Sequence, residues 1–160
     1  ILPWQIPWLN SPNWARFSVL LVNLWLGYAY MFLVATGALT SIPSDLKEAA
    51  FVDGATGFKA FRKVTFPLLL VAMAPVLISS FAFNFNNFNL IRLLTDGGPP
   101  IPGSAAGETD ILISYTYAVA FEGAGQDYGL ATAVSTIIFL LVAGISAIGF
   151  KFTRTFEEVS

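Results

Sequence analysis

The stretch Val64–Ile91, VTFPLLLVAMAPVLISSFAFNFNNFNLI, is 28 residues long and contains no Asp, Glu, Lys or Arg. A helix needs about 20 predominantly apolar residues to cross the hydrocarbon core of a bilayer. The stretch is therefore long enough to span a membrane, and tilting, kinking or projection beyond the hydrocarbon would absorb its excess length. Pro75 removes one helical hydrogen bond near its middle, so we expect a bend there.

Two further stretches on either side of this one are also free of charge and long enough to span, Phe17–Ile42 and Tyr128–Phe150. Of the 160 residues, 56% are hydrophobic and only 11% are charged, whereas soluble domains average about 45–50% and about 25%. We therefore predict an all-α, polytopic helical membrane protein with three transmembrane helices. Three buried helices of a soluble domain are the alternative that this composition disfavours.

The composition also excludes several classes of function. The chain has no cysteine, hence no disulfide framework or thiolate metal site, and no histidine, the commonest general base and metal ligand. A formal net charge of −2 gives no electrostatic reason to expect nucleic-acid binding. The chain begins at Ile1 without a basic n-region or a cleavage site. We therefore expect no signal peptide and a piece of a longer protein.

Basic residues are distributed unevenly between the segments that connect the spans. Ser41–Lys63 carries four Lys or Arg residues, and the C-terminal tail carries Lys151 and Arg154. Thr95–Asp127 carries none, but has five carboxylates. By the positive-inside rule, the first segment and the tail are cytoplasmic and Thr95–Asp127 is external.

The resulting topology has the N-terminus outside and the C-terminus inside. Three tryptophans, Trp4, Trp8 and Trp14, then lie near the outer interface, which favours Trp, and we expect Arg16 and Arg92 to reach lipid headgroups. A further apolar stretch, 111–121, is too short to span and is predicted to be an external interfacial helix or one packed on the bundle. The predicted segments are an external segment 1–16, transmembrane helices 17–42, 64–94 and 128–152, a cytoplasmic loop 43–63, an external loop 95–127 and a cytoplasmic tail 153–160.

The cytoplasmic loop has its own helix signals. Pro43 is typical of a first helical turn, and Gly54 provides a stop or a sharp turn. Gly57–Lys63 is predicted to form a second short helix. Helix propensity alone would favour a solvated connector.

The predicted cytoplasmic loop contains EAA at 48–50, Gly54 after three further residues, and VTFP at 64–67 after nine more. This pattern resembles the EAA loop of bacterial binding-protein-dependent ABC importers. The family pattern has Ile and Leu where this chain has conservative Val and Phe. The resemblance implies a coupling helix that docks into a cytoplasmic ABC ATPase homodimer, with Glu48 pairing with a basic group of the ATPase. This chain has no G-x-x-x-x-G-K-[ST] phosphate loop, so we expect no cofactor and ATP hydrolysis by the partner. The implied coupling residues are Glu48, Ala49, Ala50, Asp53 and Gly54.

Uncharged polar residues form one stripe on each of two predicted spans. Both stripes lie about 9–11 Å below the outer surface at about 1.5 Å of rise per residue, so they can converge on one site. Asn amides supply donors and acceptors for hydroxyl groups. With no charge in either stripe, a neutral polyhydroxylated substrate is predicted, and hydrogen bonding between helices is the alternative. The stripes are Asn23, Gly27 and Tyr30, and Ser80, Asn84 and Asn87, each at i, i+4 and i+7, with Phe83 beside the second.

From about Pro12 onward, the chain resembles the larger permease subunit of maltose/maltodextrin importers. The resemblance is carried by NLWLGYAY at 23–30, FAFNFNNF at 81–88, LLTDGGP at 93–99 and FEG at 121–123. The resemblance implies the bacterial inner membrane, a second permease subunit and a periplasmic or extracellular sugar-binding protein. The resemblance also implies N-terminal spans and a large external domain outside this sequence, so we expect these three spans alone not to enclose a transport pathway. The implied sugar-binding residues are Asn23, Leu26, Gly27, Tyr30, Ser80, Phe83, Asn84 and Asn87.

Other functions fit the sequence less well. A secondary transporter or channel subunit for a neutral polar solute would need an intramembrane ionisable residue, and the three stretches have none. A structural scaffold would leave the polar stripes without a role. The external carboxylates Glu108, Asp110, Glu122 and Asp127 are spread over 20 residues without a calcium-loop pattern. We expect them to be solvated, and nothing favours glycosidase chemistry at the last two.

Overall fold

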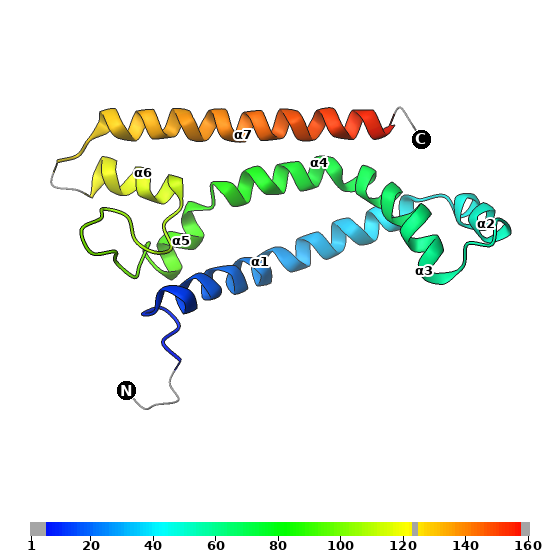
Figure 1. The fold of residues 1–160 in the computed structure, drawn as a ribbon, viewed down its shortest axis with the longest axis horizontal. Coiled ribbons are helices and arrows are strands. Elements are labelled where there is room, and N and C mark those ends of the chain that lie inside the picture. The colour runs from blue at the N-terminus through cyan, green and yellow to red at the C-terminus, as the bar shows by residue number, and fades with distance from the viewer. Residues whose placement is uncertain (1–5, 123–124, 158–160) are drawn as a thin grey trace. The chain divides into compact units, whose positions relative to one another are not determined.

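The computed structural model describes residues 6–122 and 125–157, with only the backbone given for 152 and 154–157. The described part is helical and contains no β-strand, only an isolated antiparallel bridge between Pro100 and Gly107. Trp4 lies outside the described residues. The elements in chain order are α1 (Pro12–Ser41), α2 (Ser44–Val52), α3 (Gly57–Ala60), the π-helix η1 (Phe61–Thr65), α4 (Phe66–Phe85), α5 (Phe88–Leu94), α6 (Leu112–Phe121) and α7 (Tyr128–Glu157) (Figure 1).

Three helical runs in the described chain are long and apolar enough to cross a membrane, Pro12–Ser41, Gly57–Phe85 and Tyr128–Lys151. The prediction of an all-α protein with three membrane-spanning helices is therefore confirmed. The first helix begins at Pro12 rather than at Phe17, because proline suits the first helical position and nothing in the next turn breaks the helix.

The second run differs from its prediction at its C-terminal end. We expected one helix over 64–94, but α4 ends at Phe85 and α5 begins at Phe88. The break lies at Asn86–Asn87, where the Asn87 side-chain oxygen accepts a hydrogen bond from the Leu90 amide at 3.3 Å and caps α5. Asparagine is a weak helix former and a strong N-cap, so it ends one helix by starting the next.

At its other end the second run is longer than expected. The predicted short helix Gly57–Lys63 is continuous with the span, because α3, η1 and α4 follow one another without a gap. The five residues of η1 form a π-helix, a rare arrangement that often marks a functional position. Pro75 lies inside α4, which stays helical on both sides of it. The bend there stays a prediction.

Packing divides the chain into two compact units, Ile1–Leu26 with Phe81–Ile145, and Gly27–Ser80 with Ser146–Ser160. In unit 1, α5 and α6 pack together, and the rings of Phe88 and Tyr117 lie 4.9 Å apart. In unit 2, Ile78 packs so closely on Gly149 that a Cβ there would lie 3.0 Å from it. Small residues of this kind allow close helix contacts in membranes.

Most apolar side chains of the long helices are exposed in the isolated chain. Trp25, for example, is 81% exposed, and no large side chain among the described residues is fully buried. Apolar surface on this scale is normally covered by lipid or by other protein. The long helices therefore have the surface of membrane-spanning segments rather than of a soluble core.

Candidate functional site

Two residues of the predicted polar stripes contact each other directly in unit 1. Asn87 Nδ2 donates a hydrogen bond to Asn23 Oδ1 at 3.3 Å, and both side chains are half-buried. The Asn87 oxygen accepts the Leu90 amide at the same time. Both ends of the Asn87 amide are therefore held. Since Asn87 lies in the break and not inside a helix, its cap geometry directs it, rather than the i+7 spacing from Ser80.

The Asn23–Asn87 pair retains hydrogen-bonding capacity for a ligand. A side-chain amide has two N–H donors and an oxygen with two lone pairs. The hydrogen bonds above use one N–H of Asn87, one lone pair of its oxygen and one lone pair of Asn23. The remaining donors and acceptors match the hydroxyl groups of a neutral solute and not a fixed charge.

The other predicted sugar-binding residues divide between the two units. In unit 1, Leu26 and Phe83 are exposed, and the Asn84 carbonyl accepts the Asn87 backbone amide at 3.3 Å. The structure thus brings Asn23, Asn84 and Asn87 into one neighbourhood. Unit 2 holds Gly27, Tyr30 and Ser80. That all eight residues line one pocket stays a prediction.

The EAA sequence lies on α2, a helix bounded by two special backbone positions. Pro43 precedes it in an extended conformation (φ −55°, ψ 137°), and Asp45 in its first turn suits the helix dipole. Gly54 follows it at φ +75°, the left-handed region that favours glycine. The Ala55 amide donates to the Ala50 carbonyl at 2.9 Å and closes the turn.

The exposed surface of α2 and the turn after it combines charged and apolar side chains. Ala50 is 7% exposed and packs inside the loop. Phe51, Val52 and Phe58 are exposed apolar side chains, with Val52 at 85%. An exposed helix with this mixture suits protein docking better than contact with water alone. The other predicted coupling residues, Glu48, Ala49, Asp53 and Gly54, are exposed.

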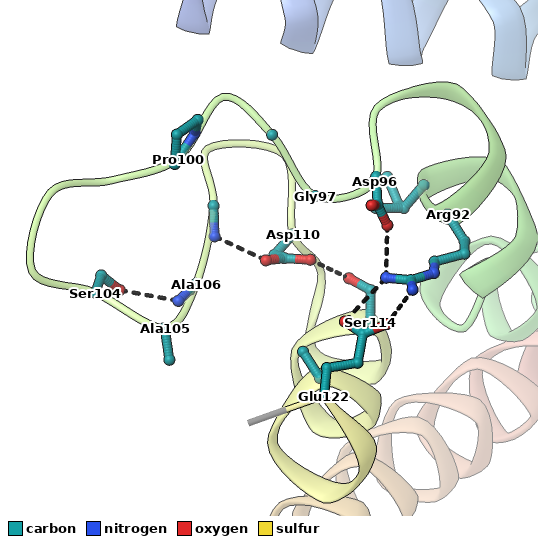
Figure 2. Close-up of a pocket in the computed structure, with 14 residues that line it drawn as sticks. Arg92, Asp96, Gly97, Pro100, Ser104, Ala105, Ala106, Asp110, Ser114 and Glu122 are labelled. Atoms are coloured by element: carbon teal, nitrogen blue, oxygen red, sulfur yellow. Dashed lines mark hydrogen bonds and ion pairs between the residues drawn. The ribbon is translucent and has the colours of Figure 1, made fainter. Parts of the chain in front are cut away.

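A charged clamp between α5 and α6, formed by Arg92, Asp96 and Glu122, was not predicted from the sequence. The Arg92 guanidinium forms a two-pronged ion pair with Glu122, with one bond of 3.0 Å, and contacts Asp96 at 2.5 Å. It also lies 5.4 Å from the Tyr117 ring centroid. The hydrogen bond with Glu122 raises the pKa of Arg92 above its usual range. Arg92, Asp96 and Glu122 line a pocket of about 250 Å³ (Figure 2).

The clamp corrects two expectations. Arg92 pairs with Glu122 rather than only reaching toward lipid, and Arg16 likewise pairs with Glu108. Glu108 and Glu122 are therefore not simply solvated. The physical reason is tertiary, because α5 packs on α6 and joins residues 30 apart in the sequence. In the sequence, the only sign of these ion pairs is that residues of opposite charge lie near the ends of the predicted helices.

The 95–111 loop beside the clamp is internally hydrogen-bonded. Asp110 accepts the Gly107 amide and the Ser114 hydroxyl, each at 2.7 Å (Figure 2). Gly97 has φ +79°, and a Cβ there would lie 2.5 Å from Asp110. Thr109 is buried and donates to a neighbouring carbonyl. No group of three or more acidic, His or Cys residues in the described chain is arranged to bind a metal ion. The shape of the loop is therefore set by its own hydrogen bonds.

The chain matches the model of a known protein family over residues 1–152, described as binding-protein-dependent transport system inner membrane component. It is 54% identical over 150 residues to the maltose/maltodextrin transport system permease protein MalF of Salmonella typhimurium, covering 92% of this chain. The MalF proteins of Escherichia coli K12 and Vibrio parahaemolyticus are 52% and 50% identical, over 92% and 94% of this chain. The chain spans 29% of the length of each of these relatives. It belongs to the family of binding-protein-dependent transport system inner membrane components.

Proposed function

We propose that the chain is part of the non-catalytic permease subunit of an ATP-driven bacterial importer for maltose/maltodextrin-like neutral oligosaccharides. The observation that carries this proposal is 54% identity, over 92% of the chain, to a maltose/maltodextrin permease protein. The geometry adds a pair of uncharged amides between apolar helices, a chemistry that suits sugar hydroxyls.

The sugar site in this proposal is centred on Asn23 and Asn87. Their open donors and acceptors bind hydroxyl groups, while the exposed aromatic ring of Phe83 provides a flat apolar surface for the sugar C–H groups. The remaining members are Leu26, Gly27, Tyr30, Ser80 and Asn84.

α2 is the coupling helix in this proposal. Its exposed Glu48 and the apolar side chains beside it dock into a cytoplasmic ABC ATPase homodimer, which hydrolyses ATP. Gly54 allows the tight turn that holds α2 against the span. A second permease subunit completes the pathway, and a periplasmic or extracellular sugar-binding protein delivers the sugar.

The orientation in the inner membrane follows from charge. The α2 segment, with four basic residues between 41 and 63, is cytoplasmic, and the basic-free 95–127 segment is external. The N-terminus of this chain is then outside, and α7 ends in the cytoplasm.

The test uses the full-length subunit with its second permease chain, ATPase and binding protein in proteoliposomes. Sugar uptake and ATP hydrolysis stimulated by the binding protein are measured for Glu48→Ala with Gly54→Pro, and for Asn84→Ala. We expect the first variant to lose stimulated hydrolysis, and the second to keep hydrolysis while losing uptake. Lys47→Ala and Asn89→Ala change exposed neighbours of the same regions and should behave as wild type.

Two results would contradict the proposal. Normal uptake in the α2 variant would remove the coupling role, and normal uptake in Asn84→Ala would assign the amides to helix packing. Uptake without any ATPase would indicate a secondary transporter or a channel instead.

A further inference from the structure

α5 is a short helix held at both ends. At its start, Asn87 caps the helix and donates to Asn23 on α1. At its end, Arg92 is held by Glu122 at the end of α6 and by Asp96. Because α5 has only seven residues, fewer than two helical turns separate Asn87 from Arg92.

The helix between the anchors is well packed. Ile91 is 3% exposed, the lowest value among the larger apolar side chains described. The Phe88 ring packs against the Tyr117 ring at an interplanar angle of 50°, and Tyr117 also lies under the Arg92 guanidinium. One ring therefore contacts both the first turn of α5 and its charged end. Arg92 and the Asn87 cap are therefore joined through one short, packed helix.

We propose that Arg92 is a positioning residue, which acts through α5 to fix the Asn87 amide against Asn23. The contacts described for its guanidinium, with Glu122, Asp96 and Tyr117, lie outside the proposed sugar site, so it acts by placing another residue. The charge is needed because the two-pronged bond to Glu122 defines the orientation of the guanidinium as well as its distance. The consequence for sugar binding rests on the proposed function.

The first experiment measures position alone. The chain contains no cysteine, so Asn23→Cys with Asn87→Cys places two thiols in it, in the full-length transporter complex with any cysteine elsewhere replaced. A short bis-methanethiosulfonate reagent then reports how readily the two positions are joined. We expect cross-linking to slow severalfold when Arg92→Gln or Glu122→Gln is added, and to recover when Arg92→Glu is combined with Glu122→Arg.

The control uses the ion pair between Arg16 and Glu108, which lies in the same unit. Arg16→Gln breaks the pair with Glu108, which does not involve α5. It should leave cross-linking of positions 23 and 87 unchanged. Unchanged cross-linking in Arg92→Gln overturns the inference, and so does an equal loss in Arg16→Gln, which would reveal general loosening of the unit.

The second experiment links position to transport. In the native amide background, Arg92→Gln should raise the sugar concentration for half-maximal uptake by roughly fivefold, the effect of one misplaced hydrogen bond, with little change in maximal rate. A cross-linking effect without this shift keeps the positioning role and contradicts the assignment of Asn87 to the sugar site. A failure of the inference and a failure of the proposed function are therefore distinguishable.

Discussion

Single residues in this chain combine structural and chemical roles, and Asn87 is the clearest case. Its oxygen caps α5, while its nitrogen reaches Asn23. A serine can keep the first role but is too short for the second, whereas alanine loses both.

We therefore expect Asn87→Ser to keep the thermal stability of the full-length subunit and to weaken sugar uptake. Asn87→Ala should weaken uptake equally and also lower stability, by about 1 kcal/mol for the lost cap. Thermal unfolding in detergent and concentration-dependent uptake measure the two effects. Equal stability of the two variants would show that the cap contributes nothing.

Gly97 and Gly103 offer a matched pair in the 95–111 loop. Both have a positive φ, +79° and +77°, but a Cβ at Gly97 would clash with Asp110, whereas nothing lies within 4 Å at Gly103. Gly103→Ala should cost about 1 kcal/mol of backbone strain, and Gly97→Ala about 2 kcal/mol more. Thermal unfolding of the full-length subunit checks the difference. Similar values for both would mean that Asp110 moves aside freely.

At the scale of elements, the sequence predicted those helices that local signals specify. Charge-free length predicted α1 and α7, and Pro43 with Gly54 predicted α2, because these signals act within one turn or one span. The break at Asn86–Asn87 was missed, because stripe spacing assumes an unbroken helix. The Arg92–Glu122 clamp was missed, since it exists only after α5 packs on α6.

The packing of α5 on α6 can be tested at Tyr117. Its ring packs at a tilt against Phe88 and lies beneath Arg92, so both contacts are made by the ring and not by the hydroxyl. Tyr117→Phe should be nearly neutral, whereas Tyr117→Ala should cost about 2 kcal/mol of stability. Hydrogen exchange of the α5 amides would report the loosening directly. Full protection in Tyr117→Ala would mean that Ile91 and the loop hold α5 without the ring.

At the scale of the whole molecule, the exposed apolar surface of the long helices indicates cover by lipid or by other protein. A long charge-free stretch is enough to predict the membrane setting from the sequence, whereas the gathering of the proposed sugar-binding residues around one pocket stays a prediction. Polar stripes indicate the depth and the helix face of such residues, but a pocket also depends on how the surrounding helices pack.

The proposed orientation predicts labelling from opposite sides of the membrane. Ala105→Cys and Thr56→Cys place thiols at two exposed positions, one in the 95–111 loop and one after α2. In the full-length subunit, a membrane-impermeant maleimide should label Ala105→Cys in outer-membrane-permeabilised cells. It should label Thr56→Cys only in inside-out vesicles. The reverse pattern would invert the topology.

The length of α4 has a consequence for the surrounding lipid. Its 20 residues, at about 1.5 Å each, measure about 30 Å, the thickness of a typical hydrocarbon core. Arg62 and Lys63 lie before it, and the Asn86–Asn87 break lies directly after it. α4 alone is therefore about as long as the hydrocarbon core is thick, and the helix continues beyond it through η1 and α3 at the basic end. We expect bilayers of a different thickness to tilt or strain this helix, and the Asn86–Asn87 break to take up part of that strain beside the Asn23–Asn87 contact.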